Sequence, residues 1–205
     1  MLSGWKHPYI DADVMEIVGG RKQLLDQANI LENETNAGKM DAVRLMGQIV
    51  KETAEKTAVL RSANMSLGVN LLLKLVQEAA KVLASSGFDI EIVEKHHNQK
   101  KDAPSGTALA LAESMNEALG NQYHYVYDRS SVHEKRDPKE IGIASVRGGS
   151  IVGDHDVIFA GKDEVITFNH TAYSKAIFAK GALEAAKFLA GKEPGLYDMS
   201  NVVQL

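Results

Sequence analysis

The sequence predicts an α/β fold in which a mixed, largely antiparallel four-stranded sheet carries helices on one face. Residues 88–93 alternate apolar and acidic side chains, a period that is typical of a strand with one buried face. Residues 141–146, 154–160 and 164–172 have the composition of three further strands joined by glycine-rich connections. Apolar residues recur at helical spacing in the segments around them, so the chain contains both kinds of element.

The elements before the first of these strands can be predicted in order along the chain. Residues 1–38 carry the weakest pattern, and residues 39–53 follow as an amphipathic helix. Residues 57–62 have the pattern of a strand, which leads into a helix from Leu67 to about Leu83. This second helix is apolar on most of its faces, which predicts that it is deeply buried or lies at a subunit interface.

The segment between the first strand of the sheet and the next helix carries the most distinctive chemistry. It consists of Glu94-Lys-His-His-Asn-Gln-Lys-Lys-Asp-Ala-Pro-Ser-Gly-Thr-Ala108, so two histidines lie at a strand end and Ser-Gly-Thr begins a helix. A helix start presents unpaired backbone N–H groups and the positive end of the helix dipole. Gly106 lets an anion approach the backbone closely, and the histidines titrate near neutral pH. The segment therefore predicts a pocket for a carboxylate or phosphate beside an acid–base group.

Other interpretations of this segment stay open on the residues alone. Adjacent histidines on a loop are often surface residues, and Ser-Gly-Thr before a helix is often only a cap. A metal site is disfavoured, because adjacent histidines on a strand point to opposite faces and the chain contains no cysteine.

Composition argues against several classes of function. The net charge is −4 with both signs interspersed, which argues against a nucleic-acid partner bound through a basic patch. The absence of cysteine excludes disulfides and thiol chemistry. The first residues lack the apolar core of a signal peptide and no apolar run is long enough to span a bilayer, so we expect a cytoplasmic chain without a membrane partner. Residues 128–138 are rich in charge and predict an exposed, solvated excursion.

Residues 96–108 closely resemble the signature of the dihydrodipicolinate reductases, also called 4-hydroxy-tetrahydrodipicolinate reductases. Residues 62–70 and 194–199 are similar to two other segments of that family, and the likeness runs from about Lys56 to Leu205. The resemblance implies reduction of a cyclic imine dicarboxylate to tetrahydrodipicolinate by NADH or NADPH, on the route to diaminopimelate and lysine. It also implies a homotetramer in which the sheets pack together.

The resemblance gives several residues an expected role. His96 would be the general acid, and Lys100 a second proton donor or a charge-stabilising group. His97 would contact the substrate, and Gly106 and Thr107 would bind one of its carboxylates through backbone N–H and hydroxyl. The cofactor side of the site would be lined by Ser62, Ala63, Asn64 and Met65.

Three more polar positions match the family near the substrate pocket or its support. They are residues 145–147, residues 153–155 and His170. For each of them, a structural hydrogen bond explains the residue at least as well as a direct role does.

The N-terminal part departs from the family pattern. The family has a dinucleotide-binding domain there, but residues 1–55 contain no G-x-G-x-x-G turn and are too few for a doubly wound sheet before the helix at Lys39. We therefore expect a shortened remnant of a Rossmann-like domain in residues 1–66, with weakened binding of NADPH or NADH. We expect a substrate-binding and oligomerisation domain in residues 67–190, and a C-terminal segment, residues 191–205, that packs back toward the N-terminal part.

Two functions fit this organisation. The chain is either an active NAD(P)H-dependent reductase that binds a small dicarboxylate, or a catalytically silent dicarboxylate-binding or assembly module derived from such a reductase. The intact signature favours the first function, whereas the missing glycine-rich turn favours the second.

Overall fold

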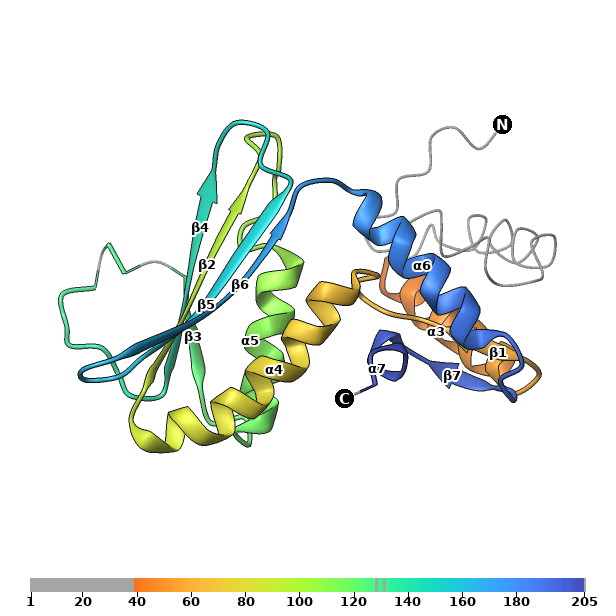
Figure 1. Ribbon diagram of the computed structural model, residues 1–205, viewed down its shortest axis with the longest axis horizontal. Coiled ribbons are helices and arrows are strands. Elements are labelled where there is room, and N and C mark those ends of the chain that lie inside the picture. The colour runs from red at the N-terminus through yellow and green to blue at the C-terminus, as the bar shows by residue number, and fades with distance from the viewer. Residues whose placement is uncertain (1–38, 128, 131, 205) are drawn as a thin grey trace. The chain divides into compact units, whose positions relative to one another are not determined.

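The computed structural model of the chain describes residues 39–127, 129–130 and 132–204, which form two compact units (Figure 1). One unit comprises residues 66–177, and the other comprises the described residues 39–65 and 178–204. The boundary after the sheet lies at residue 177, whereas the middle domain was predicted to end at residue 190. The difference arises because most of the helix Ala176–Leu189 groups with the N-terminal unit. Within the described ranges, no helix is both long and apolar enough to cross a membrane.

The larger unit is built on a mixed sheet with the strand order β3-β4-β2-β5-β6. Its four long strands are β2 (Asp89–His96), β4 (Glu140–Arg147), β5 (Gly153–Ala160) and β6 (Val165–Ala172). Strand β2 pairs with β4 in parallel and with β5 antiparallel, and β5 pairs with β6 antiparallel. These four strands are the predicted ones, and two of their three pairings are antiparallel.

A fifth strand corrects the predicted count of four. Strand β3 (His124–Val126) lies at the edge of the sheet and pairs in parallel with β4. It has three residues, too few to show the alternation that identifies a strand in a sequence. Its extended form depends on the hydrogen bonds that β4 provides.

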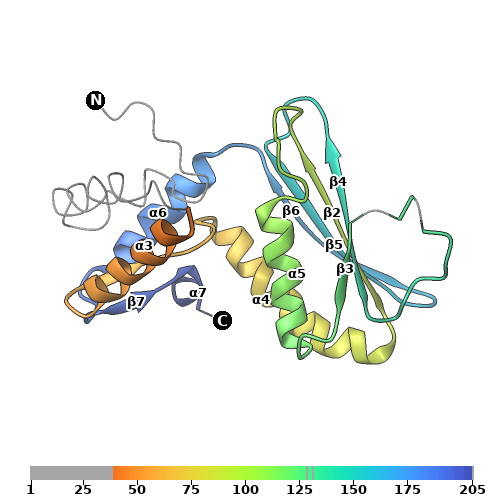
Figure 2. The same ribbon diagram turned by 180° about the vertical axis from the view of Figure 1, so that it is seen from behind.

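Two helices cover one face of this sheet (Figures 1 and 2). Helix α4 (Leu67–Leu83) begins at Ser66, whose side chain accepts a hydrogen bond from the N–H of Val69, and helix α5 (Gly106–Ala118) begins at Ser105 in the same way. The alternating strands and the two helices bury their apolar faces against each other. This core consists of Leu72, Val76, Ala80, Ile90, Ile92, Ala108, Leu111, Ala112, Met115, Ile141, Ile143, Val157 and Phe159.

The charged segment before β4 is partly fixed by Arg136, so the prediction of a fully solvated excursion is wrong at this residue. Its guanidinium donates to the carboxylates of Glu91 (2.8 Å) and Asp89 (2.9 Å). It also donates to the backbone carbonyls of Ile90 (2.9 Å) and Glu140 (2.6 Å). Arg136 therefore ties the segment to the first residues of β2 and β4.

The second unit contains a small parallel pair of strands. Its elements are α3 (Lys39–Ala54), β1 (Ala58–Leu60), most of α6 (Ala176–Leu189), β7 (Gly195–Tyr197) and α7 (Met199–Val202). Strand β7 pairs in parallel with β1. The C-terminal segment that begins at residue 191 is thereby hydrogen-bonded to residues that precede the larger unit in sequence.

We expect the chain to form an oligomer through the sheet face that lies opposite α4 and α5. By strand alternation this face carries Val146 and Val165, which are exposed. Exposed apolar side chains on a sheet face that no described helix covers are typical of a subunit interface. Light scattering at micromolar concentration should give a multiple of the chain mass. Val146→Lys with Val165→Lys should reduce that mass, whereas Val132→Lys, in the exposed segment before β4, should not; a monomer mass for the unmodified chain would contradict the expectation.

Candidate active site

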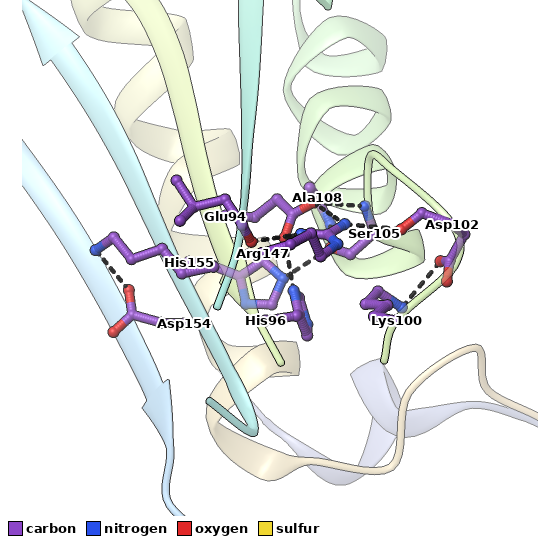
Figure 3. A network of polar contacts seen from close by, with 11 residues as sticks. Glu94, His96, Lys100, Asp102, Ser105, Ala108, Arg147, Asp154 and His155 are labelled. Carbon is purple, nitrogen blue, oxygen red and sulfur yellow. Dashed lines mark hydrogen bonds and ion pairs between the residues drawn. The ribbon is translucent and has the colours of Figure 1, made fainter. Parts of the chain in front are cut away.

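The candidate site is organised around a buried carboxylate, that of Glu94 (Figure 3). Residues of β2 alternate, so Glu94 and His96 point to the same covered face as Ile90 and Ile92. The Glu94 side chain is fully buried, and a buried carboxylate needs partners. Its main partner is Arg147, whose Nη1 and Nη2 donate to Oε2 and Oε1 at 2.8 and 2.7 Å.

The parallel pairing of β2 and β4 explains how these two side chains meet. The register places His96 opposite Arg147, so the carboxyl ends of the two strands lie at the same edge of the sheet. Arg147 also donates from Nη2 to the carbonyl of Asp102 at 2.7 Å. The guanidinium thus links two strands to the loop that carries the signature residues.

The charge state of Glu94 follows from these contacts. Burial alone would raise the pKa of its carboxyl group, but hydrogen bonds from Arg147, Ser145 and His96 outweigh burial and lower the pKa to about 2. The same ion pair raises the pKa of Arg147. Glu94 is therefore an anion at neutral pH.

His96 is held by Glu94 through one ring nitrogen. Its Nδ1 lies 2.6 Å from Glu94 Oε2, and since a carboxylate only accepts hydrogen bonds, Nδ1 is the donor. Burial lowers the pKa of His96, and Glu94 opposes that shift. The neutral imidazole therefore carries its proton on Nδ1, and Nε2 is the nitrogen at which a proton can be gained or lost.

His155 on β5 supports the start of α5. Its Nε2 lies 2.9 Å from Ser105 Oγ, and this hydroxyl also accepts from the N–H of Ala108 at 3.1 Å. Burial is the main cause that lowers the pKa of His155 to about 4, and the charge of His96 acts in the same direction. The two imidazoles meet edge to face with ring centroids 5.1 Å apart. His155 is therefore a neutral, structural neighbour of His96.

The predicted anion-binding group lies at the first turn of α5. Glu94 Oε1 accepts from the N–H of Ser105 at 3.1 Å, which fixes the helix start against β2. Gly106 is exposed, and a Cβ added there would meet no atom within 4 Å, so its backbone is open to a ligand. Thr107 follows it and is half-buried. The dipole of α5 favours an anion at this point.

The loop between β2 and α5 brings Lys100 near the histidine. Lys100 Nζ forms an ion pair with Asp102 Oδ2 at 2.9 Å, and the charge of Lys100 contributes to the lowered pKa of His96. The N–H of Lys100 donates to the carbonyl of His97, which is half-buried. The N–H of Asn98 in this loop donates to the carbonyl of Gly149, which follows β4.

The structure brings most of the predicted site residues into one unit. His96, His97, Lys100, Gly106 and Thr107 all belong to β2, to the first turn of α5 or to the loop between them. The four residues predicted for the cofactor lie in the turn that follows β1 and belong to the other unit, with Ser62 Oγ donating to the carbonyl of Asn64 at 3.1 Å. These are Ser62, Ala63, Asn64 and Met65.

The sequence reasoning gave no role to Glu94 and left the role of Arg147 open. One signal was present, since the alternation of β2 puts a carboxylate in line with Ile90 and Ile92. Among the residues that the structure describes, no cluster of three or more His, Cys, Asp or Glu side chains could hold a metal ion.

Comparison with known proteins identifies the family. The family model described as dihydrodipicolinate reductase, C-terminus, matches residues 68–203. The chain belongs to the dihydrodipicolinate reductase family. This confirms the resemblance predicted from the sequence.

Relatives within the dihydrodipicolinate reductase family are similar over the same region. A 4-hydroxy-tetrahydrodipicolinate reductase of Caldanaerobacter subterraneus subsp. tengcongensis is 60% identical over 155 residues, and one of Clostridium tetani is 51% identical over 151 residues. The alignments cover 76% and 74% of this chain but 61% and 58% of the two relatives. The chain therefore spans less than two thirds of the length of these curated relatives.

A solved structure supports the fold assignment. It is described as dipicolinate-bound dihydrodipicolinate reductase from Paenisporosarcina sp. TG-14, and it is 27% identical to this chain with a TM-score of 0.61. The match covers 75% of this chain and 58% of that one. The predicted α/β class with a mixed sheet is confirmed.

Proposed function

We propose that the chain binds a small cyclic dicarboxylate at the first turn of α5 and delivers a proton to it from His96, as a 4-hydroxy-tetrahydrodipicolinate reductase. The observation that carries this proposal is the buried contact between Glu94 and His96 beside an open helix start. The names of the relatives support the same reaction. The reaction would be NAD(P)H-dependent reduction of the cyclic imine to tetrahydrodipicolinate, as in diaminopimelate and lysine biosynthesis.

Substrate binding in this proposal uses charge and backbone together. One carboxylate would accept hydrogen bonds from the N–H of Gly106 and from Thr107 at the positive end of the α5 dipole. Lys100 and His97 would contact the substrate from the loop. Hydrogen bonds to a charged group contribute roughly 1.5–3 kcal/mol each, which is enough to select a dicarboxylate over an uncharged ring.

Proton transfer follows from the state of His96. Burial lowers the pKa of His96, so it is largely neutral before a ligand binds. A dianion bound beside the ring stabilises the imidazolium and raises that pKa. Substrate binding would thus favour protonation of His96 at Nε2, and His96 would then donate this proton to the substrate. Lys100 would stabilise the negative charge that remains on the substrate.

In this proposal a dinucleotide cofactor would contact the described residues through its nicotinamide end. Ser62 to Met65 connect β1 to α4, and by the family resemblance they would line the nicotinamide side. Within residues 39–65, no strand leads through a glycine-rich turn into a helix, which is where a pyrophosphate binds. A reduced nicotinamide would supply the hydride, whereas the residues described above supply substrate binding and the proton.

Binding of pyridine-2,6-dicarboxylate tests the proposal directly. Calorimetric titration should show binding that tightens as pH falls toward the usual imidazole pKa of about 6.5, because the complex takes up a proton. Thr107→Val with Lys100→Ala should weaken binding by about tenfold or more, since each charged hydrogen bond contributes more than the 1.4 kcal/mol that equals tenfold. The matched control is Lys101→Ala with Thr57→Val, which changes the same residue types at exposed positions. Equal affinity of the two double variants would remove this site from consideration.

We expect the isolated chain to bind NADH and NADPH weakly and to turn over slowly. Residues 39–65 provide no glycine-rich turn for the pyrophosphate, so several charge-assisted hydrogen bonds are lost, and every 1.4 kcal/mol that is lost weakens binding tenfold. A fluorescence titration and a turnover assay with both cofactors measure this. Micromolar affinity for NADPH would contradict the expectation. Dicarboxylate binding with no turnover at any cofactor concentration would instead support a catalytically silent dicarboxylate-binding module.

A further inference from the structure

We propose that Glu94 is the positioning residue of this site, and that its one carboxylate fixes both the tautomer of His96 and the start of α5. The proton-donating ring and the anion-binding turn are then held by a single side chain. The identity of the ligand on which these two groups act rests on the proposed function. The positioning role of Glu94 itself is argued from its contacts within the protein.

The contacts of Glu94 leave little freedom for either oxygen. Oε2 accepts from His96 Nδ1 at 2.6 Å and from Arg147 Nη1 at 2.8 Å. Oε1 accepts from Arg147 Nη2 at 2.7 Å and from the N–H of Ser105 at 3.1 Å. These donors come from β2, β4 and the residue before α5, and the side chain of Ser145 on β4 adds a further hydrogen bond to the carboxylate. Rotation of the carboxylate would break several of these bonds at once, so the arrangement is rigid.

An ionised carboxylate is the side chain that this arrangement requires. It accepts at both oxygens, whereas the amide of a glutamine accepts at one end and donates at the other. Glutamine at position 94 would therefore put an N–H against either His96 or the donors on Ser105 and Arg147. The proton on His96 Nδ1 would lose its fixed acceptor, and Nε2 would no longer be defined as the reactive nitrogen.

The charges around His96 predict how its titration responds to Glu94. Glu94 on β2 is the anion that contacts the ring, whereas Lys100 from the loop and Arg147 from β4 are cations, and His155 on β5 lies edge to face with it. Removal of the Glu94 charge takes away the contacts that raise the pKa of His96 and leaves the lowering effects of burial, Lys100 and Arg147. The pKa of His96 should therefore fall in Glu94→Gln.

Imidazole nitrogen NMR on the full chain, with His96 assigned through His96→Gln, tests this inference without any ligand. The unmodified chain should show neutral His96 protonated at Nδ1. Glu94→Gln should show a mixture of tautomers and a titration midpoint at lower pH. Glu91→Gln is the matched control, because Glu91 lies on the same strand but on the opposite face, paired with Arg136. In that variant the signals of His96 should not change.

A second variant keeps the test decisive if Glu94→Gln alone does not fold. Glu94→Gln with Arg147→Met removes both members of the buried pair, so neither charge remains alone in the interior. A His96 tautomer identical to that of the unmodified chain, in either variant, would overturn the inference. The titration midpoint is read only in Glu94→Gln, because Arg147→Met also removes a cation that lowers the pKa of His96. Dicarboxylate affinity should also fall by about tenfold or more in the folded variant, since the start of α5 loses its anchor.

The two proposals fail in different ways. If the unmodified chain does not bind pyridine-2,6-dicarboxylate but the tautomer of His96 depends on Glu94, the proposed function is wrong and the positioning role stands. If dicarboxylate binds to the unmodified chain and the tautomer of His96 does not change when Glu94 is replaced, the proposed function stands and the positioning role is wrong.

Discussion

Replacement of Arg147 by methionine should lower the free energy of unfolding by about 3–5 kcal/mol at neutral pH, because it breaks a buried ion pair from one side. Arg147 donates from both terminal nitrogens to Glu94 and from Nη2 also to the carbonyl of Asp102. Methionine retains much of the apolar stem but leaves the fully buried Glu94 carboxylate without its cation. Urea unfolding followed by circular dichroism measures the loss.

The size of this loss should depend on pH in a way that identifies Glu94 as its origin. In the unmodified chain, the pKa of Glu94 is lowered from 4.5 to about 2, so its contribution to stability is complete above pH 4.5 and is lost as the pH falls toward 2. Without Arg147, burial raises the pKa of Glu94 instead. The variant should therefore approach the unmodified chain in stability as the pH falls from neutral into this range.

An exposed ion pair provides the control for this experiment. Lys81 and Glu78 are paired across one turn of α4 at 2.6 Å, with side chains that are 49% and 72% exposed. Because water screens such a pair, Lys81→Met should change the free energy of unfolding by less than about 1 kcal/mol. If Arg147→Met were equally mild, or if its effect were independent of pH, the Glu94–Arg147 pair would not be a main support of the site.

The sequence was sufficient for those elements whose patterns are local. Alternation in β2 and the helical spacing after Ser105 predicted a strand, a loop and a helix start in that order, and the structure contains all three. The same holds for α4, which runs from Leu67 to Leu83 as predicted. In each case the period of the apolar residues and a capping residue determine the element.

The features that were missed depend on contacts between distant residues. Glu94 and Arg147 are 53 positions apart, and only the parallel register of β2 and β4 brings them together. Strand β3 likewise forms against β4 at a sheet edge, and Arg136 finds its partners at the start of β2. The pairing register depends on contacts between residues that are far apart in the sequence, so local sequence patterns did not predict these contacts.

Replacement of His96 by glutamine should lower kcat by roughly 10²–10⁴-fold, a far larger effect than its effect on KM. The proton is transferred only in the transition state, so most of the loss should appear in kcat, whereas the charge of the imidazolium makes a smaller contribution to substrate binding. Glutamine can retain a hydrogen bond to Glu94 but cannot exchange a proton near neutral pH. Steady-state kinetics at high concentrations of NADPH and NADH measures the effect, since the cofactor is expected to bind weakly.

Two other histidines show whether the loss is specific to proton transfer. His97→Gln should raise KM more than it lowers kcat, because His97 is expected to contact the substrate without giving it a proton. His133→Gln, at an exposed position in the segment before β4, should leave both parameters unchanged. An unchanged kcat in His96→Gln would assign His96 to structure, and its contact with Glu94 at 2.6 Å would then serve to hold the end of β2 rather than to orient a proton donor.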